Sequence, residues 1–75
     1  MDEMLATLLS AIPGCSVLTP YVRKDKLFIP IYFHREVKTE DCEYLSDISR
    51  IFGITFIVAK EELKNNVSIR RIECF

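Results

Sequence analysis

The residue types in this chain that could carry nucleophilic or metal chemistry are a single histidine and three cysteines. They are His34, Cys15, Cys42 and Cys74. A thiolate beside a histidine is a nucleophile, and four such side chains can complete a zinc site. The pattern favours neither, because the cysteines lie far apart in the sequence and form no close pair. We therefore predict no metal site and no cofactor, with His34 hydrogen-bonded to a neighbour on a sheet face.

The acidic residues and the glycines form no catalytic motif either. Four carboxylates lie along one predicted helix, and they are Glu40, Asp41, Glu43 and Asp47. Such a helix face is ordinarily solvated. The 2 glycines, Gly14 and Gly53, are too few for a phosphate-binding loop. We predict that the protein is not an enzyme.

The composition is that of one small globular domain spanning residues 1–75. Hydrophobic residues make up 49% of the chain and charged residues 28%, and the net charge is −1. These values exclude a disordered chain and argue against strong non-specific binding to nucleic acid. An odd number of widely spaced cysteines is typical of a reducing compartment. We expect a cytoplasmic protein without a membrane span, since we recognise no signal peptide and no apolar run of spanning length.

The hydrophobic spacing predicts an α+β fold with the element order α-β-β-α-β-β. Pro13-Gly14 ends the first helix, Thr39 is the predicted N-cap of the second, and Gly53 ends it. The predicted elements are helix 2–12, strands 15–23 and 26–34, helix 39–52, strand 54–58, a helical turn or loop at 59–64, a turn at 65–66 and strand 67–72. The simplest packing places two helices on one face of a four-stranded antiparallel sheet. Lys24-Asp25 is the predicted hairpin turn, and Pro20 and Pro30 are expected at an edge position or a bulge.

The segment Leu27–Phe33 is the most informative part of the predicted sheet. It has no charged residue, and alternation gives it two apolar faces. Two helices can cover only one face, so the other is left for a partner. Simple alternation assigns to that face Val17, Tyr21, Phe28, Tyr32, His34, Phe56 and Val58. Exposed aromatic surfaces of this kind mark interaction sites, and we predict a partner-binding site formed by Phe28, Tyr32, His34, Tyr21 and Phe56.

Two further surfaces are open to interpretation. The apolar stripe of the first helix, which includes Leu5, Leu8 and Leu9, either packs on the sheet or forms the seam of a dimer. A second set consists of basic residues, and its members are Arg23, Lys24, Lys26 and Arg70. These residues either contact nucleic-acid phosphates or are ordinary edge charges that resist aggregation.

Residues 5–15 and 31–58 resemble the LAGLIDADG homing endonucleases. The first segment is similar to a degenerate form of the namesake helix, and the second, with its Phe52-Gly53-Ile54 step, to the family's strand, helix and return strand. The resemblance implies an α-β-β-α-β-β fold and a sheet that reads DNA. The family's metal-binding carboxylate is missing, because Ser10, Ile12 and Pro13 stand near that position. The resemblance therefore implies a module without nuclease activity.

Two functions follow as expectations from these patterns. The favoured one is a non-enzymatic protein-interaction module (an inhibitor, an adaptor or an assembly subunit) that acts through its aromatic-rich sheet face, through self-association as a homodimer, or through both. The alternative is a nucleic-acid-binding module derived from a catalytically inactive LAGLIDADG-like domain, with aromatic residues that stack on bases.

Overall fold

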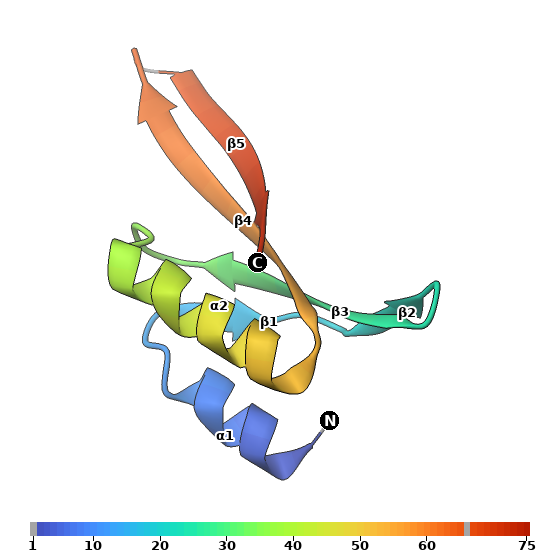
Figure 1. Ribbon diagram of the computed structural model, residues 1–75. Helices are drawn as coiled ribbons and strands as arrows, with labels where there is room; N and C mark the ends of the chain where they lie inside the picture. The colour runs from blue at the N-terminus through green and yellow to red at the C-terminus, as the bar shows by residue number, and fades with distance from the viewer. Residues whose placement is uncertain (1, 66) are drawn as a thin grey trace.

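The computed structural model describes residues 2–65 and 67–75, which form two helices and a mixed sheet (Figure 1). The elements in chain order are α1 (Glu3–Ser10), β1 (Cys15–Val17), β2 (Tyr21–Arg23), β3 (Lys26–Phe33), α2 (Thr39–Phe52), β4 (Thr55–Lys64) and β5 (Val67–Cys74). The predicted α+β class is confirmed. The predicted element order matches in part, because the expected strand 15–23 is divided into β1 and β2.

The sheet has the strand order β1-β3-β4-β5, and β2 also pairs with β3. β1 and β2 run antiparallel to β3, and β5 runs antiparallel to β4. β3 and β4 are parallel, so the prediction of a wholly antiparallel sheet is wrong at this central pair. The physical reason is the connection: α2 carries the chain back along the sheet, and a helical crossover joins strands that run in the same direction.

A bulge divides the edge strand into β1 and β2. Val17 lies opposite Ile31, whereas Tyr21 lies opposite Phe28, so the outer strand has one residue more than β3 between these pairs. An extra residue of this kind bends the strand and interrupts its pairing.

The two prolines of the sheet lie at this bulge, as predicted. Pro20 belongs to the interrupted segment, and the carbonyl oxygen of Pro30 accepts the N–H of Leu18 at 2.9 Å. The nitrogen and carbonyl oxygen of a strand residue point to the same side. The missing N–H of Pro30 therefore faces the bulge and costs no hydrogen bond to β4.

Backbone capping fixes where the helices begin and end. Asp2 caps α1, since its Oδ1 accepts hydrogen bonds from two N–H groups of the first turn. The N-cap of α2 is Lys38 rather than the predicted Thr39, and Oδ2 of Asp41 accepts the Lys38 N–H at 2.8 Å. Gly53 ends α2 with φ of 66°, the left-handed conformation predicted for it.

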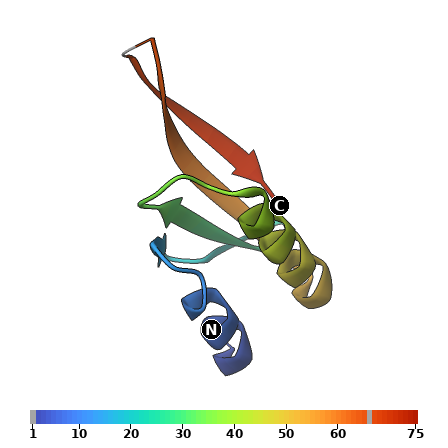
Figure 2. The ribbon, with the colours of Figure 1, turned by 90° about the vertical axis from the view of Figure 1, so that its left-hand side faces the viewer.

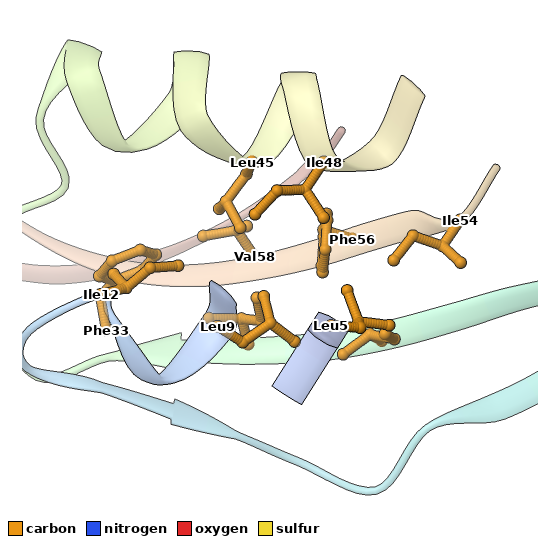
Figure 3. Packing of buried hydrophobic residues seen from close by; sticks show 11 residues of the cluster. Leu5, Leu9, Ile12, Phe33, Leu45, Ile48, Ile54, Phe56 and Val58 are labelled. Carbon is orange, nitrogen blue, oxygen red and sulfur yellow. The ribbon is translucent and has the colours of Figure 1, made fainter. Parts of the chain in front are cut away.

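Both helices pack on the same face of the sheet (Figures 1 and 2). The core between them is a cluster of buried aliphatic and aromatic residues, seen in Figure 3: Leu5, Leu9, Ile12, Ile29, Ile31, Phe33, Leu45, Ile48, Ile54, Phe56 and Val58. The parallel register places Ile29 opposite Phe56 and Ile31 opposite Val58. These four residues therefore share the face that the helices cover.

This packing corrects two of the predicted surfaces. Phe56 and Val58 have exposed fractions of 0%, so they belong to the core and not to the partner-binding face. Between Ile54 and Val58 the only polar residue is Thr55, while Ile57 is apolar like Phe56 and Val58, so alternation gave only a weak signal for the phase of this strand. Leu5 and Leu9 of the proposed dimer seam are likewise buried against the sheet, and Leu8 packs beside them, half-buried.

β4 and β5 form a long hairpin that extends beyond the helices (Figure 1). The predicted helical turn or loop at 59–64 is instead the second half of β4, paired with β5 as far as Lys64 opposite Val67. Asn65 begins the turn with φ of 53°, and Asn66 lies outside the described residues. Among the helices that the structure describes, none has the length and apolar character needed to cross a membrane.

Candidate functional site

The sheet face opposite the helices is the candidate site, and we call it the open face. The strand registers assign to it Ser16, Tyr21, Arg23, Lys26, Phe28, Pro30, Tyr32, His34, Thr55, Ile57, Ala59 and Cys74. Over the part of the chain that the structure describes, neither helix covers this face (Figure 2). The predicted phase of β3 is thus correct, and four of the five predicted partner-binding residues lie together on it: Tyr21, Phe28, Tyr32 and His34.

A stacked aromatic pair lies at one end of the open face. Tyr21 of β2 and Phe28 of β3 are cross-strand partners, with ring centroids 5.3 Å apart and ring planes 11° from parallel. Tyr21 remains 42% exposed. Stacked pairs of this kind contribute about 0.5–1.5 kcal/mol beyond the area they bury, so the two rings hold each other flat on the sheet.

A second aromatic pair lies at the other end of β3. The rings of Tyr32 and His34 meet edge to face, with centroids 5.0 Å apart. The Nε2 atom of His34 lies 2.5 Å from Oγ of Ser16, and the His34 N–H donates to the carbonyl oxygen of Gly14 at 2.7 Å. These contacts fix the histidine at the rim of the face, in the hydrogen-bonded role predicted for it.

The contact between Ser16 and His34 has the residue types of a nucleophile and its base. Such a pair acts in catalysis when a third group orients the histidine. Among residues 2–65 and 67–75, no carboxylate hydrogen-bonds to His34. The contact holds the imidazole ring at the rim of the open face.

Uncharged residues continue the open face from β3 onto β4. Pro30 lies opposite Ile57, and Tyr32 lies opposite Ala59. All four are half-buried, because β3 and β4 are inner strands and each has a neighbouring strand along both of its edges. From Tyr21 to Ile57 the surface is thus a flat apolar and aromatic band without a formal charge.

The predicted basic set does not form one patch. Arg23 and Lys26 are cross-strand partners, and the Lys24-Asp25 turn between them has positive φ at both residues, as a tight hairpin turn requires. Arg70 lies on β5, at the opposite edge of the sheet. This separation contradicts the hypothesis that the four basic residues line one phosphate-contacting rim.

The cysteines and the histidine are not brought together. Cys15 lies opposite Phe33 in register, on the helix-covered side, whereas His34 belongs to the open face. Burial raises the pKa of the Cys15 thiol, and the nearby charge of Arg35 opposes that rise, so the thiol is the stable form. Cys42 is on α2 and Cys74 is on β5. Within the described residues, no three histidine, cysteine or acidic side chains are grouped as metal ligands.

An ion pair that the sequence did not reveal joins the start of α2 to the end of α1. The guanidinium of Arg35 donates to both carboxylate oxygens of Asp41, at 2.7 and 2.9 Å, and its Nε donates to the carbonyl oxygen of Pro13 at 2.8 Å. Its stem packs on Gly14, where a Cβ would lie 3.2 Å from it, and its charge lies 5.1 Å from the centre of the Phe33 ring. We call Arg35 and Asp41 the latch.

The latch also forms the polar wall of a surface pocket between the two helices. The pocket is lined by Ala11, Ile12, Pro13, Arg35, Lys38, Glu40, Asp41 and Tyr44. On its wall the Arg35 guanidinium and the Asp41 carboxylate already bind each other. The Tyr44 hydroxyl donates to the carbonyl oxygen of Leu8 at 2.7 Å. The pocket is therefore a seam between elements. The open face remains the candidate site.

The latch should make stability depend on pH. The hydrogen-bonded guanidinium of Arg35 lowers the pKa of Asp41 to about 2. A carboxylate with a lowered pKa stabilises the fold above its ordinary pKa of about 4, and this contribution is lost as pH falls from about 4 to 2. We expect Asp41→Asn to be less stable than the wild type at pH 7, with the difference shrinking towards pH 2, as measured by urea unfolding.

Asp47→Asn is the matched control for this prediction. Asp47 is on the same helix and pairs with Arg50 at 3.0 Å, but its side chain is 61% exposed. Exposed pairs contribute little to stability, so this substitution should have a small effect at pH 7. A difference between Asp41→Asn and the wild type that stays constant from pH 7 to pH 2 would contradict the role of the latch.

Comparisons with models of protein families, with curated proteins and with solved structures found no match for this chain. The resemblance to the LAGLIDADG homing endonucleases thus stays a prediction. The geometry of the open face is the basis for the function proposed next.

Proposed function

We propose that this protein is a non-enzymatic protein-interaction module whose open face binds an apolar surface of a protein partner. The observation that carries the proposal is the uncharged aromatic band on the face that neither helix covers, with Tyr21 and Phe28 at one end and Tyr32 towards the other. Burying such side chains in a complex yields more free energy than burying polar ones, and aromatic residues are enriched at the centres of interfaces.

The chemistry of the band favours a protein over nucleic acid. A nucleic-acid-binding face presents lysine and arginine around its aromatic residues, because phosphate contacts supply much of the affinity. Here Arg23, Lys24 and Lys26 lie beside Asp25 at one end of the band only, and the whole chain has a net charge of −1. The expected partner therefore has an uncharged patch of matching size, rich in aliphatic or aromatic side chains.

The proposal can be tested by photo-crosslinking from two positions. Benzoylphenylalanine replaces Tyr21 on the open face in one variant, and the exposed Ser46 on α2 in the control. We expect a protein adduct from position 21 that is absent from position 46 and that survives nuclease treatment. Adducts with nucleic acid from position 21 would support the alternative function, and equal adducts from both positions would contradict the open face as the binding site.

A further inference from the structure

The β5 strand forms one edge of the sheet, and it has a regular pairing pattern on its inner side. The register with β4 runs without interruption from Ile57 opposite Cys74 to Lys64 opposite Val67, and Phe56 and Phe75 exchange both backbone hydrogen bonds, at 2.8 and 2.9 Å. In an antiparallel pair the backbone groups of alternate residues point to the partner strand. Counting back from Phe75, the residues that bond to β4 are Glu73, Arg71, Ile69 and Val67.

The remaining residues of β5 direct their backbone groups away from β4. They are Ser68, Arg70, Ile72 and Cys74. Within residues 2–65 and 67–75, no strand pairs with this outer side. A row of unpaired N–H and C=O groups on a regular strand is a template for pairing with another strand.

The opposite edge of the sheet differs from β5. There the outer strand is broken into two pieces of 3 residues each, with a bulge and Pro20 between them. Bulges and prolines are the devices by which proteins prevent edge-to-edge pairing. β5 has 8 residues and no proline. Each chain thus has one edge suited to strand addition.

We propose that β5 pairs antiparallel with β5 of a second copy of this chain. A two-fold axis brings the same strand to both sides of the seam. Since the described residues of each chain offer a single regular edge, the pairing closes at the dimer and does not continue into a fibre. The edge uses backbone groups of β5, whereas the open face presents side chains, and the inference does not rest on the proposed function.

The sequence of β5 selects among the possible registers. A two-fold axis at Arg70 or at Arg71 would place an arginine opposite its own copy, and like charges directly opposite are destabilising. An axis at Ile72 places Ile72 opposite Ile72 of the partner subunit and Arg71 opposite Glu73 of the partner subunit, twice by symmetry. Apolar and opposite-charge pairs both stabilise a sheet. An axis at Ile69 also avoids arginine pairs but gives no opposite-charge pair, so we assign the axis to Ile72.

The arrangement has a consequence for the open face. A two-fold axis through a continuous sheet is perpendicular to it, so both copies present their helices on one side and their open faces on the other. The dimer then has two aromatic bands on one surface, which suits a partner that is itself repeated or symmetric.

The test is the mass of the full chain in solution, measured by sedimentation equilibrium over a range of concentrations. We expect the wild type to reach twice the chain mass of 8.7 kDa. Ile72→Pro removes an outward N–H that β4 does not use, and should give a monomer with an unchanged circular dichroism spectrum. A wild type that stays monomeric at all concentrations would overturn the proposal.

Charge exchange tests the register. It also tests whether the β5 edges pair at all, if Ile72→Pro fails to fold. Arg71→Glu and Glu73→Arg should each raise the dimer Kd by about tenfold, because two attractive pairs become repulsive. The double variant should restore dimerisation. Additive weakening in the double variant would overturn this register. Tyr32→Glu serves as the control: it should leave the dimer intact, and a monomer in its place would show that the open face, not the β5 edge, joins the copies.

Discussion

Substitution of Phe56 with alanine is expected to lower the free energy of unfolding by about 3–5 kcal/mol. Phe56 is completely buried, between the two helices and β3 (Figure 3). Removing its ring loses the apolar burial and leaves a cavity that the small core cannot fill. Domains of this size have a total stability on the order of 5–10 kcal/mol, so the variant should lose between about a third and all of its stability, as measured by urea or thermal unfolding.

Phe28→Ala is the matched control, because it deletes the same ring from the same sheet on the opposite face. Phe28 is half-buried and contacts Tyr21. We expect a loss of about 1–2 kcal/mol, which is the stacking contribution and part of the apolar burial. An effect of Phe28→Ala equal to that of Phe56→Ala would mean that both faces of the sheet are covered within one chain.

Substitution of Tyr32 with glutamate is expected to weaken partner binding by at least about 100-fold, or about 2.7 kcal/mol. The change places a charge within the uncharged band, where complex formation would bury it without a partner group. The domain itself should stay folded, since Tyr32 projects from the face opposite the core. Calorimetry with the protein identified by crosslinking measures the loss.

Ile51→Glu is the control for the effect of adding a charge. Ile51 is 72% exposed on α2, on the helical side of the molecule. Glutamate there adds the same charge far from the open face, and it should leave the affinity unchanged. If Ile51→Glu weakened binding as much as Tyr32→Glu, the partner would contact the helices, and the assignment of the site would be wrong.

The sequence correctly predicted the parts of the fold that depend on local patterns. These are segments with a clear polar and apolar periodicity, and positions where glycine, proline or a turn pair ends a helix or strand. The two helices, the hairpin turn at Lys24-Asp25, the end of α2 at Gly53 and the bulge prolines all follow from local preferences. The two faces of β3 were also predicted correctly, because its neighbours His34 and Lys26 limit the strand and its phase is anchored by the hairpin.

The features that the sequence did not predict depend on contacts between residues that are far apart in the chain. From Ile54 to Val58 both faces of the strand include an apolar residue and Thr55 is the one polar residue, so the pairing with β3 is what firmly places Phe56 in the core. The parallel pairing itself depends on the path of α2. The latch joins Arg35 to Asp41 and to the Pro13 carbonyl, and no pattern within a short window shows that these groups meet.

The measurement that tests the central claim most directly is a set of intermolecular nuclear Overhauser effects between the labelled protein and its crosslinked partner. The ring protons of Phe28 and Tyr32 report on the open face, and the side chains of Met4 and Ile51, which are 66% and 72% exposed, report on the two helices. We predict effects at Phe28 and Tyr32 and none at Met4 and Ile51. Effects confined to Met4 and Ile51 would contradict the proposed function.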